Sequence, residues 1–94
     1  ALKHFPIDTT VRFSDSEIGE SVTVMEVIAQ DRPGLLLQVA KALLSCKIRL
    51  VNAKVGTFGA RAEDIFYVTD RDGFPVTDRS QRACVEEQIR SALP

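Results

Sequence analysis

The sequence predicts an α+β fold, in which a four-stranded antiparallel sheet carries two helices on one face. The first observation is the order of the apolar patterns along the chain, which reads strand, strand, helix, strand, strand, helix. The second is size, because 94 residues, 45% of them hydrophobic, suffice for one layered core. We therefore assign residues 9–94 to a single domain and residues 1–8, interrupted by Pro6, to a leader or linker.

The first half of the chain supplies two strands and a helix. Residues 9–13 are rich in β-branched and aromatic side chains, and residues 22–29 are apolar almost throughout, as in a central strand. Residues 31–34 then break the strand, with Pro33 expected at the first helical position and Asp31 expected to serve the free N–H groups beside it. We expect one apolar helix stripe that contains Leu35, Leu36, Val39, Ala40, Leu43 and Leu44.

The second half supplies two strands and a second helix. The strands are predicted at residues 48–57 and 62–69, joined by a hairpin turn at 58–61. The helix is predicted from 78 to 93. Asp78 and Gln81 have the spacing of a capping box, and Glu86 and Arg90 the spacing of an ion pair one turn apart.

This order is that of a ferredoxin-like β-α-β-β-α-β unit without its closing strand. The sequence ends directly after the second helix, whereas an extra strand at residues 9–13 precedes the first core strand. We predict that this N-terminal strand pairs antiparallel with residues 22–29 and takes the place of the closing strand.

The residues that could support catalysis or metal binding are few. Cys46 and Cys84 are 38 positions apart in amphipathic segments, so we expect two reduced, packed thiols and no zinc site. His4 has no candidate partner. Glu63 and Asp64 are adjacent on a strand and therefore point to opposite faces, which argues against a paired acid–base site. We accordingly predict no catalytic residue, no metal and no cofactor, and we assign Phe66 and Tyr67 to core packing rather than to RNA stacking.

The formal net charge is −1, from 12 Lys and Arg against 13 Asp and Glu. This balance argues against a general nucleic-acid binder, whose surface is usually strongly basic. The chain has no apolar run long enough to span a membrane and opens without a signal-peptide pattern, so we expect a cytoplasmic protein. The charge is nevertheless uneven, since residues 32–62 contain six basic residues and no acidic one.

Two segments resemble the ACT domain family of regulatory modules. Residues 24–36 (VMEVIAQDRPGLL) resemble the first strand, loop and helix start of an ACT domain. Residues 54–70 (KVGTFGARAEDIFYVTD) are most similar to the C-terminal ACT domain of bacterial PII uridylyltransferase/uridylyl-removing enzymes. The resemblance implies a glutamine-sensing domain that regulates catalytic domains outside this chain, acts on the PII protein only through that parent enzyme, and has no catalytic activity itself.

The resemblance also implies where an amino acid binds. Gly34 leaves the N–H groups at the start of the helix open to a carboxylate, and Asp31 is placed to receive an ammonium group. The pocket is completed, in ACT domains that bind ligands, by the start of the next strand and by a neighbouring domain. The candidate ligand-binding residues are therefore Asp31, Gly34, Leu35, Leu36, Arg49, Leu50 and Asn52.

Two simpler interpretations stay open. Residues 31–34 have the composition of an ordinary strand-to-helix turn. Arg49 stands in a stretch, KIRL, where many ACT domains have GINI with an Asn that touches the ligand. The alternative function is therefore a ligand-free module that pairs with a second ACT domain, either the preceding domain of a longer chain or a symmetric copy.

Overall fold

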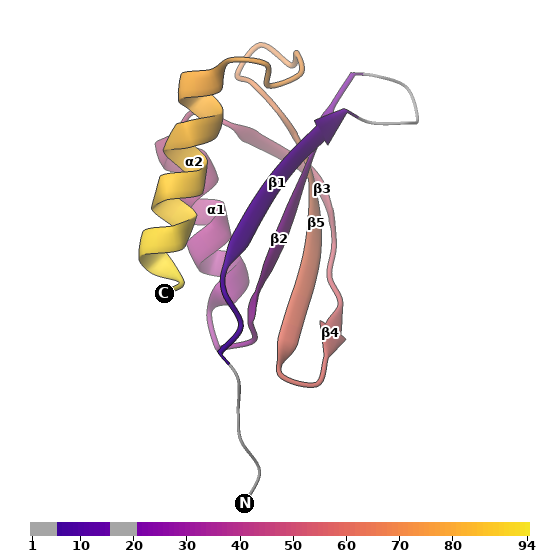
Figure 1. The fold of residues 1–94 in the computed structure, drawn as a ribbon. Coiled ribbons are helices and arrows are strands. Elements are labelled where there is room, and N and C mark those ends of the chain that lie inside the picture. The colour runs from indigo at the N-terminus through magenta and orange to yellow at the C-terminus, as the bar shows by residue number, and fades with distance from the viewer. Residues whose placement is uncertain (1–5, 16–20) are drawn as a thin grey trace, which may run out of the picture.

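The computed structural model describes residues 6–15 and 21–94, which form one sheet and two helices (Figure 1). The elements in chain order are β1 (Thr10–Asp15), β2 (Thr23–Gln30), α1 (Leu35–Ser45), β3 (Arg49–Lys54), β4 (Thr57–Phe58), β5 (Arg61–Thr69) and α2 (Arg79–Ala92). Neither helix of these described ranges has the length and hydropathy that a membrane span requires.

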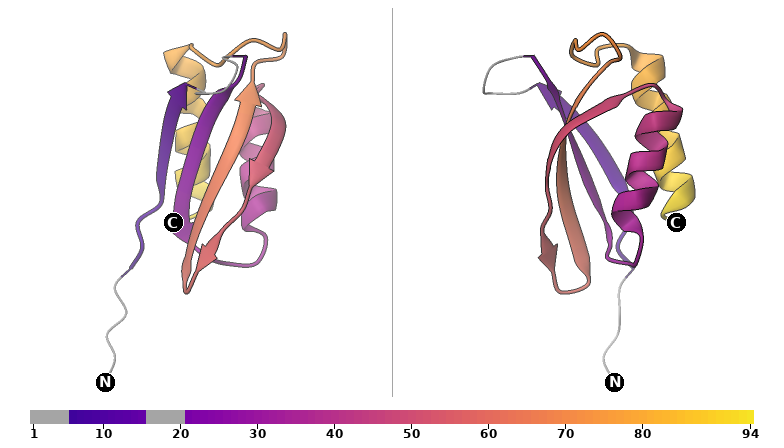
Figure 2. Two further views of the ribbon diagram at one scale, coloured as in Figure 1. Left: turned by 90° about the vertical axis from the view of Figure 1, so that its right-hand side faces the viewer. Right: turned by 180° about the vertical axis from the view of Figure 1, so that it is seen from behind.

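The sheet is antiparallel throughout, with strand order β1-β2-β5-β3, and the short β4 pairs with β5 beyond the end of β3. Both helices cover the same face (Figure 2). β1 pairs with β2 from Thr10 opposite Ile28 to Asp15 opposite Thr23. The prediction that an N-terminal strand replaces the closing strand is thereby confirmed. Residues 16–20, between these two strands, lie outside the described residues.

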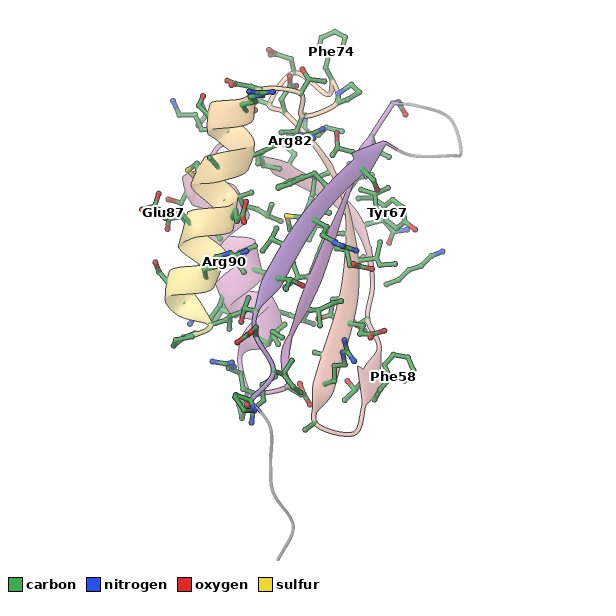
Figure 3. The ribbon with its side chains drawn as sticks, viewed as in Figure 1. Phe58, Tyr67, Phe74, Arg82, Glu87 and Arg90 are labelled. Carbon is green, nitrogen blue, oxygen red and sulfur yellow. A yellow bond between two sulfur atoms is a disulfide. The ribbon has the colours of Figure 1, made fainter. Side chains whose placement is uncertain are left out.

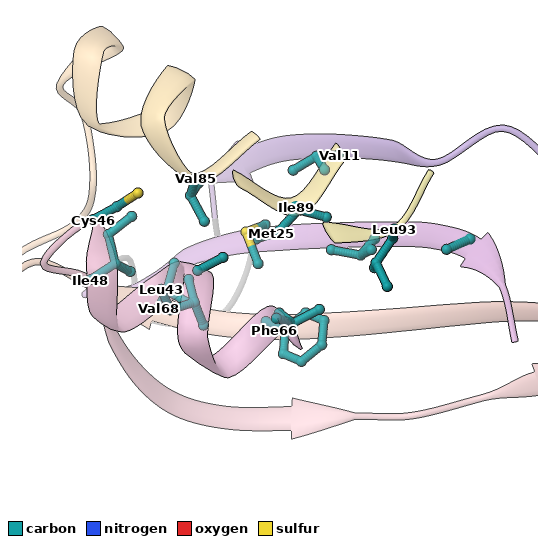
Figure 4. Packing of buried hydrophobic residues seen from close by; sticks show 14 of the residues in the cluster. Val11, Met25, Leu43, Cys46, Ile48, Phe66, Val68, Val85, Ile89 and Leu93 are labelled. Atoms are coloured by element: carbon teal, nitrogen blue, oxygen red, sulfur yellow. The ribbon is translucent and has the colours of Figure 1, made fainter. Parts of the chain in front are cut away.

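The core lies between the sheet and the two helices (Figure 4). Alternate residues of β2, among them Met25 and Val27, are fully buried and face the helices. Phe66 of β5 is the largest fully buried side chain and is 2% exposed. From α2, Val85 and Ile89 enter the same core, as the helical spacing predicts.

The start of α2 confirms one half of the predicted capping box. Asp78 is the N-cap, and its Oδ1 accepts hydrogen bonds from the backbone N–H and the hydroxyl of Ser80, both at 2.9 Å. Gln81 does not return to Asp78. Its Nε2 donates instead to the carbonyl oxygens of Cys46 at 3.2 Å and Lys47 at 3.1 Å, because these groups at the end of α1 lack helical partners.

The start of α1 differs from the prediction. The helix begins at Leu35, and its N-cap is Gly34 in the left-handed conformation with φ 78°. Pro33 lies outside the helix, and the Asp31 side chain does not cap it. The left-handed residue redirects the chain between β2 and α1, so the turn ends later than the proline pattern indicates.

The apolar stripe of α1 is also only partly buried. Val39 and Leu43 are buried as expected, but Leu36 and Leu44 are 48% and 79% exposed. The helix packs against the sheet and against α2, whereas its remaining side faces outward (Figure 2). An apolar pattern therefore identified the helix correctly and overestimated how much of it is covered.

The prediction of two reduced thiols is wrong. Cys46, directly after α1, forms a disulfide with Cys84 of α2, and their Cα atoms lie 5.9 Å apart. The helices pack side by side and bring together two residues 38 positions apart, which the spacing in sequence does not reveal. No group of three or more potential metal ligands occurs within residues 6–15 and 21–94.

Reduction of this disulfide should lower the free energy of unfolding by about 3–4 kcal/mol, because the bond closes a 38-residue separation and restricts the unfolded chain. Urea denaturation with and without a dithiol reductant measures the difference. The Cys84→Ser variant is the control, and its stability should not respond to reductant. Equal stability of the wild type in both conditions would contradict the disulfide.

Truncation of the central aromatic residue should be costly. Phe66→Ala should lower the free energy of unfolding by about 3–5 kcal/mol, since the buried ring leaves a cavity between sheet and helices. Phe74→Ala is the matched control, because its ring is 66% exposed and its loss should change stability by less than about 0.5 kcal/mol. Similar losses in both variants, measured by urea denaturation, would show that Phe66 does not organise the core.

Candidate functional site

The loop between β2 and α1 is held in place by its own backbone. The Asp31 N–H donates to the Ala60 carbonyl at 2.8 Å, which ties the loop to the turn before β5. Arg32 donates through Nε to the Gln30 carbonyl and through Nη2 to the Pro94 carbonyl, both at 3.2 Å. These contacts fix the path of the chain and leave the Asp31 side chain exposed.

Gly34 gives this loop its accessibility. A Cβ built on Gly34 would meet nothing within 4 Å, so the space beside the helix start is open. No side chain caps this end of α1, and its first turn contains no acidic residue. The Leu35 N–H donates to the Arg32 carbonyl at 3.3 Å. The positive end of a helix dipole favours a carboxylate, and the role expected of Gly34, Leu35 and Leu36 in binding one stays a prediction.

Asp64 is a second carboxyl group near this loop, and the sequence predicted no binding or catalytic role for it. It is 4% exposed on the helix-facing side of β5, while Glu63 lies on the opposite face, as predicted. Its Oδ1 accepts the Gly56 N–H at 3.2 Å, in the segment that separates β3 from β4. This contact and the Glu63 N–H bond to the Gly56 carbonyl interrupt the single strand predicted for residues 48–57.

Burial raises the pKa of Asp64, and the negative charge of Asp31 adds to the rise, while the Gly56 N–H acts in the opposite direction. The charge of Asp31 thus acts on Asp64 at the end of the sheet that carries the loop. The sequence could have indicated that Asp64 is buried. It alternates along the strand with the same spacing as Ala62, Phe66 and Val68, which lie on the buried side.

The other predicted wall lies at the opposite end of the sheet. Gln30, which precedes the loop, pairs with Arg61, whereas Arg49 pairs with Thr69. These two partners are eight positions apart on β5, a distance of about 26 Å along a strand. The structure therefore brings Asp31, Gly34, Leu35 and Leu36 together and places Arg49 and Leu50 away from them.

Each residue of that second wall is exposed. The Nη1 of Arg49 donates to the Arg71 carbonyl at 3.3 Å. Asn52 folds back on its own strand, where its Oδ1 accepts the Ala53 N–H at 2.9 Å. A bulge between Leu50 and Asn52 interrupts the pairing with β5.

The adjacent aromatic residues Phe66 and Tyr67 of β5 lie in two different environments. Phe66 is in the core, as predicted, but Tyr67 is half-buried on the face of the sheet away from the helices (Figure 3). The Nζ of Lys54 lies 5.8 Å from the centroid of the Tyr67 ring. The prediction that Tyr67 packs in the core is therefore wrong. Its ring instead lies beside the ammonium group of Lys54 on β3, at the distance of a cation–π contact.

The raised pKa of Asp64 predicts a specific pH dependence. The folded chain binds this proton more tightly than the unfolded chain, so Asp64 lowers stability as pH rises from acid through its folded pKa. Asp64→Asn keeps an acceptor for Gly56 and does not titrate. Its free energy of unfolding minus that of the wild type should therefore increase from about pH 3 to neutral pH.

Chemical denaturation at several pH values measures this difference. In an Asp31→Asn background the increase should be smaller, because one cause of the raised pKa has been removed. A difference that stays constant or decreases with pH would contradict the assignment.

Comparison with known proteins relates the whole domain to one family. Residues 18–93 match a sequence model described as the ACR family N-terminal ACT domain. The chain is 44% identical over 88 residues to a bifunctional uridylyltransferase/uridylyl-removing enzyme of Methylococcus capsulatus, covering 94% of this chain and 10% of that protein. It is 43% identical over 92 residues to the enzyme of the same name from Azotobacter vinelandii, covering 98% of this chain and 10% of that protein.

No solved structure matches the chain significantly. The chain spans about a tenth of the length of the curated relatives it matches. The expected position at the C-terminal end of a longer enzyme stays a prediction, since the matched model describes an N-terminal ACT domain. The family itself is established by the match over residues 18–93 and by the identity to these relatives: the chain belongs to the ACT family of regulatory domains.

Proposed function

We propose that this chain is the amino-acid-sensing ACT domain of a cytoplasmic uridylyltransferase/uridylyl-removing enzyme, and that its ligand is glutamine. The observation that carries the proposal is the open helix start at Gly34 beside the exposed Asp31, in a chain 44% identical to such an enzyme. In this proposal the domain reports nitrogen status to catalytic domains outside the chain. The PII protein is then a partner of the parent enzyme.

The chemistry of the loop suits a zwitterion. The first-turn N–H groups of α1 after Leu35, whose own N–H donates to the Arg32 carbonyl, provide the carboxylate site. Asp31, which has no ion-pair partner within the described residues, provides the ammonium site. The Asp64 carboxylate, whose charge interacts with that of Asp31, adds negative potential at this site. The carboxylate and the ammonium group of an amino acid would thus each have a complementary partner within one turn of chain.

The second wall of the pocket comes from a neighbouring domain in this proposal. Arg49, Leu50 and Asn52 of the same chain are too distant, because about 26 Å of β5 separates Arg49 from the end of β2. They would instead face the loop of whichever ACT domain lies alongside β3. A complete glutamine site therefore requires two domains, and the test must include both.

Glutamine should bind a longer polypeptide that carries this domain and its neighbouring ACT domain, as measured by isothermal titration calorimetry. Asp31→Asn should weaken binding at least about 10-fold, because it removes the charged acceptor for the ammonium group. Asp72→Asn is the control with the same charge change, since Asp72 is exposed in the turn after β5. The absence of heat and of a thermal shift at millimolar glutamine would count against the proposal.

The alternative, a ligand-free pairing module, is favoured by one observation. The guanidinium of Arg49 is engaged by the Arg71 carbonyl of its own chain and stands where many ACT domains have the ligand-contacting Asn. In this alternative, Arg49→Asn leaves the response of the two-domain polypeptide to glutamine unchanged. A changed response would reject it.

A further inference from the structure

One sulfur of the disulfide between the two helices is open to attack from solution. The chain has two cysteines, and both take part in this bond. Cys46 is 5% exposed and packs in the core (Figure 4), whereas Cys84 is half-buried at the margin of the core. Cys84 also lines a shallow hollow on the outer surface of α2, together with the small side chains of Ser80 and Ala83. A thiolate in solution therefore reaches Cys84 more readily than Cys46.

The fold has a core of its own besides this bond. Buried apolar side chains form one cluster between the sheet and both helices, from Val11 of β1 to Leu93 after α2. Small secreted domains rely on several disulfides because they lack such a core. We therefore expect the reduced chain, with two thiols, to stay folded.

The bond helps to hold the turn that connects α1 to β3. Lys47 has φ 62° and is the only residue other than glycine with a positive φ in the described part of the chain. This left-handed conformation is unfavourable for a residue with a side chain and persists only where its surroundings hold it. The Ile48 N–H donates to the Leu43 carbonyl at 2.9 Å, and Gln81 donates to the carbonyls on either side of the peptide bond that joins Cys46 to Lys47. The disulfide fixes the preceding residue, and among these contacts it alone can be broken and restored by a redox reaction.

We propose that Cys46 and Cys84 form a reversible redox site, at which a cellular dithiol reduces the bond and thereby releases the turn at residues 46–48. Cytoplasmic thiols are kept reduced, so disulfides that form in the cytoplasm are usually transient. The inference goes beyond the proposed function and rests on it only for this compartment.

Reduction proceeds in two steps. A thiolate of the dithiol attacks the Sγ of Cys84, which forms a mixed disulfide and releases Cys46 as a thiolate that takes up a proton. The second thiol of the reductant loses its proton and attacks the mixed disulfide, so that the reductant leaves as a disulfide and Cys84 becomes a thiol. The protein thereby gains two electrons and two protons.

A peroxide reverses the change. Hydrogen peroxide oxidises the Cys84 thiol to a sulfenic acid and leaves as water. The Cys46 thiol then attacks the sulfenic sulfur and displaces a second molecule of water, which restores the disulfide.

Redox exchange of the 94-residue chain without denaturant tests the site. Dithiothreitol should convert both cysteines into thiols that a maleimide labels, and the near-ultraviolet circular dichroism should still be that of a folded chain. Hydrogen peroxide should then restore an unlabelled chain. A bond that dithiothreitol reduces only in urea would overturn the proposal, because such a bond is purely structural.

The charge of Glu87 tests which sulfur is attacked. Glu87 is exposed and lines the same hollow as Cys84, one turn along α2, so its carboxylate repels an approaching thiolate. Glu87→Lys should raise the rate of reduction by dithiothreitol at least about 3-fold at low ionic strength, and added salt should remove the gain. Asp72→Lys is the control with the same charge change, and it should leave the rate unchanged because Asp72 is exposed in the turn after β5. Equal effects of the two variants would overturn attack at Cys84.

Cleavage by a lysine-specific protease measures the release of the turn. Lys47 and Lys54 are both exposed, and Lys54 lies on β3. Reduction should raise the rate of first cleavage after Lys47 at least about 10-fold relative to first cleavage after Lys54, because the turn opens locally. Global unfolding would accelerate both cleavages equally, so an unchanged ratio would overturn the link between the redox site and the turn. None of these assays contains glutamine, so their outcomes and that of the calorimetry are independent.

Discussion

The central position of β2 is the constraint on which the rest of the structure depends. β2 pairs along its full length with β5 and from Thr23 to Ile28 with β1, so six of its eight residues have a strand partner on both sides. Its alternate residues, including Met25, Val27 and Ala29, are fully buried against the helices. β1 occupies the position beside β2 that the closing strand of a β-α-β-β-α-β unit would take, so β2 has a strand on each side.

The same arrangement leaves β3 as an uncovered strand. Among the described strands it pairs with β5 alone, and its side chains from Arg49 to Lys54 are exposed. The loop at residues 31–34 and the start of β3 at Arg49 are consequently at opposite ends of the sheet. A ligand site that uses both kinds of residue requires a neighbour along β3, so the site and the open edge are two consequences of one topology.

Local patterns in the sequence were enough to predict the elements. A nearly continuous apolar run located β2, and helical spacing located α1 and α2, because these signals depend on how much of an element is buried. Contacts between elements were not predictable in this way. The Cys46–Cys84 bond and the two hydrogen bonds from Gln81 to the end of α1 exist only after the helices pack together. Conversely, the helical apolar pattern predicted that Leu36 and Leu44 are core residues, although no element of the described chain covers them.

The net charge of −1 conceals an uneven distribution of charge over the described residues. The ion pairs within the described residues, Arg61–Glu63 and Arg90–Glu86, each join neighbours on one element, so they leave the cations of β3 without carboxylates. Cations beside an exposed edge also protect it, since they repel a second identical edge and suppress aggregation. The uneven charge of the chain therefore appears as a cationic border at the open edge of the sheet, where Arg49 and Lys54 lie.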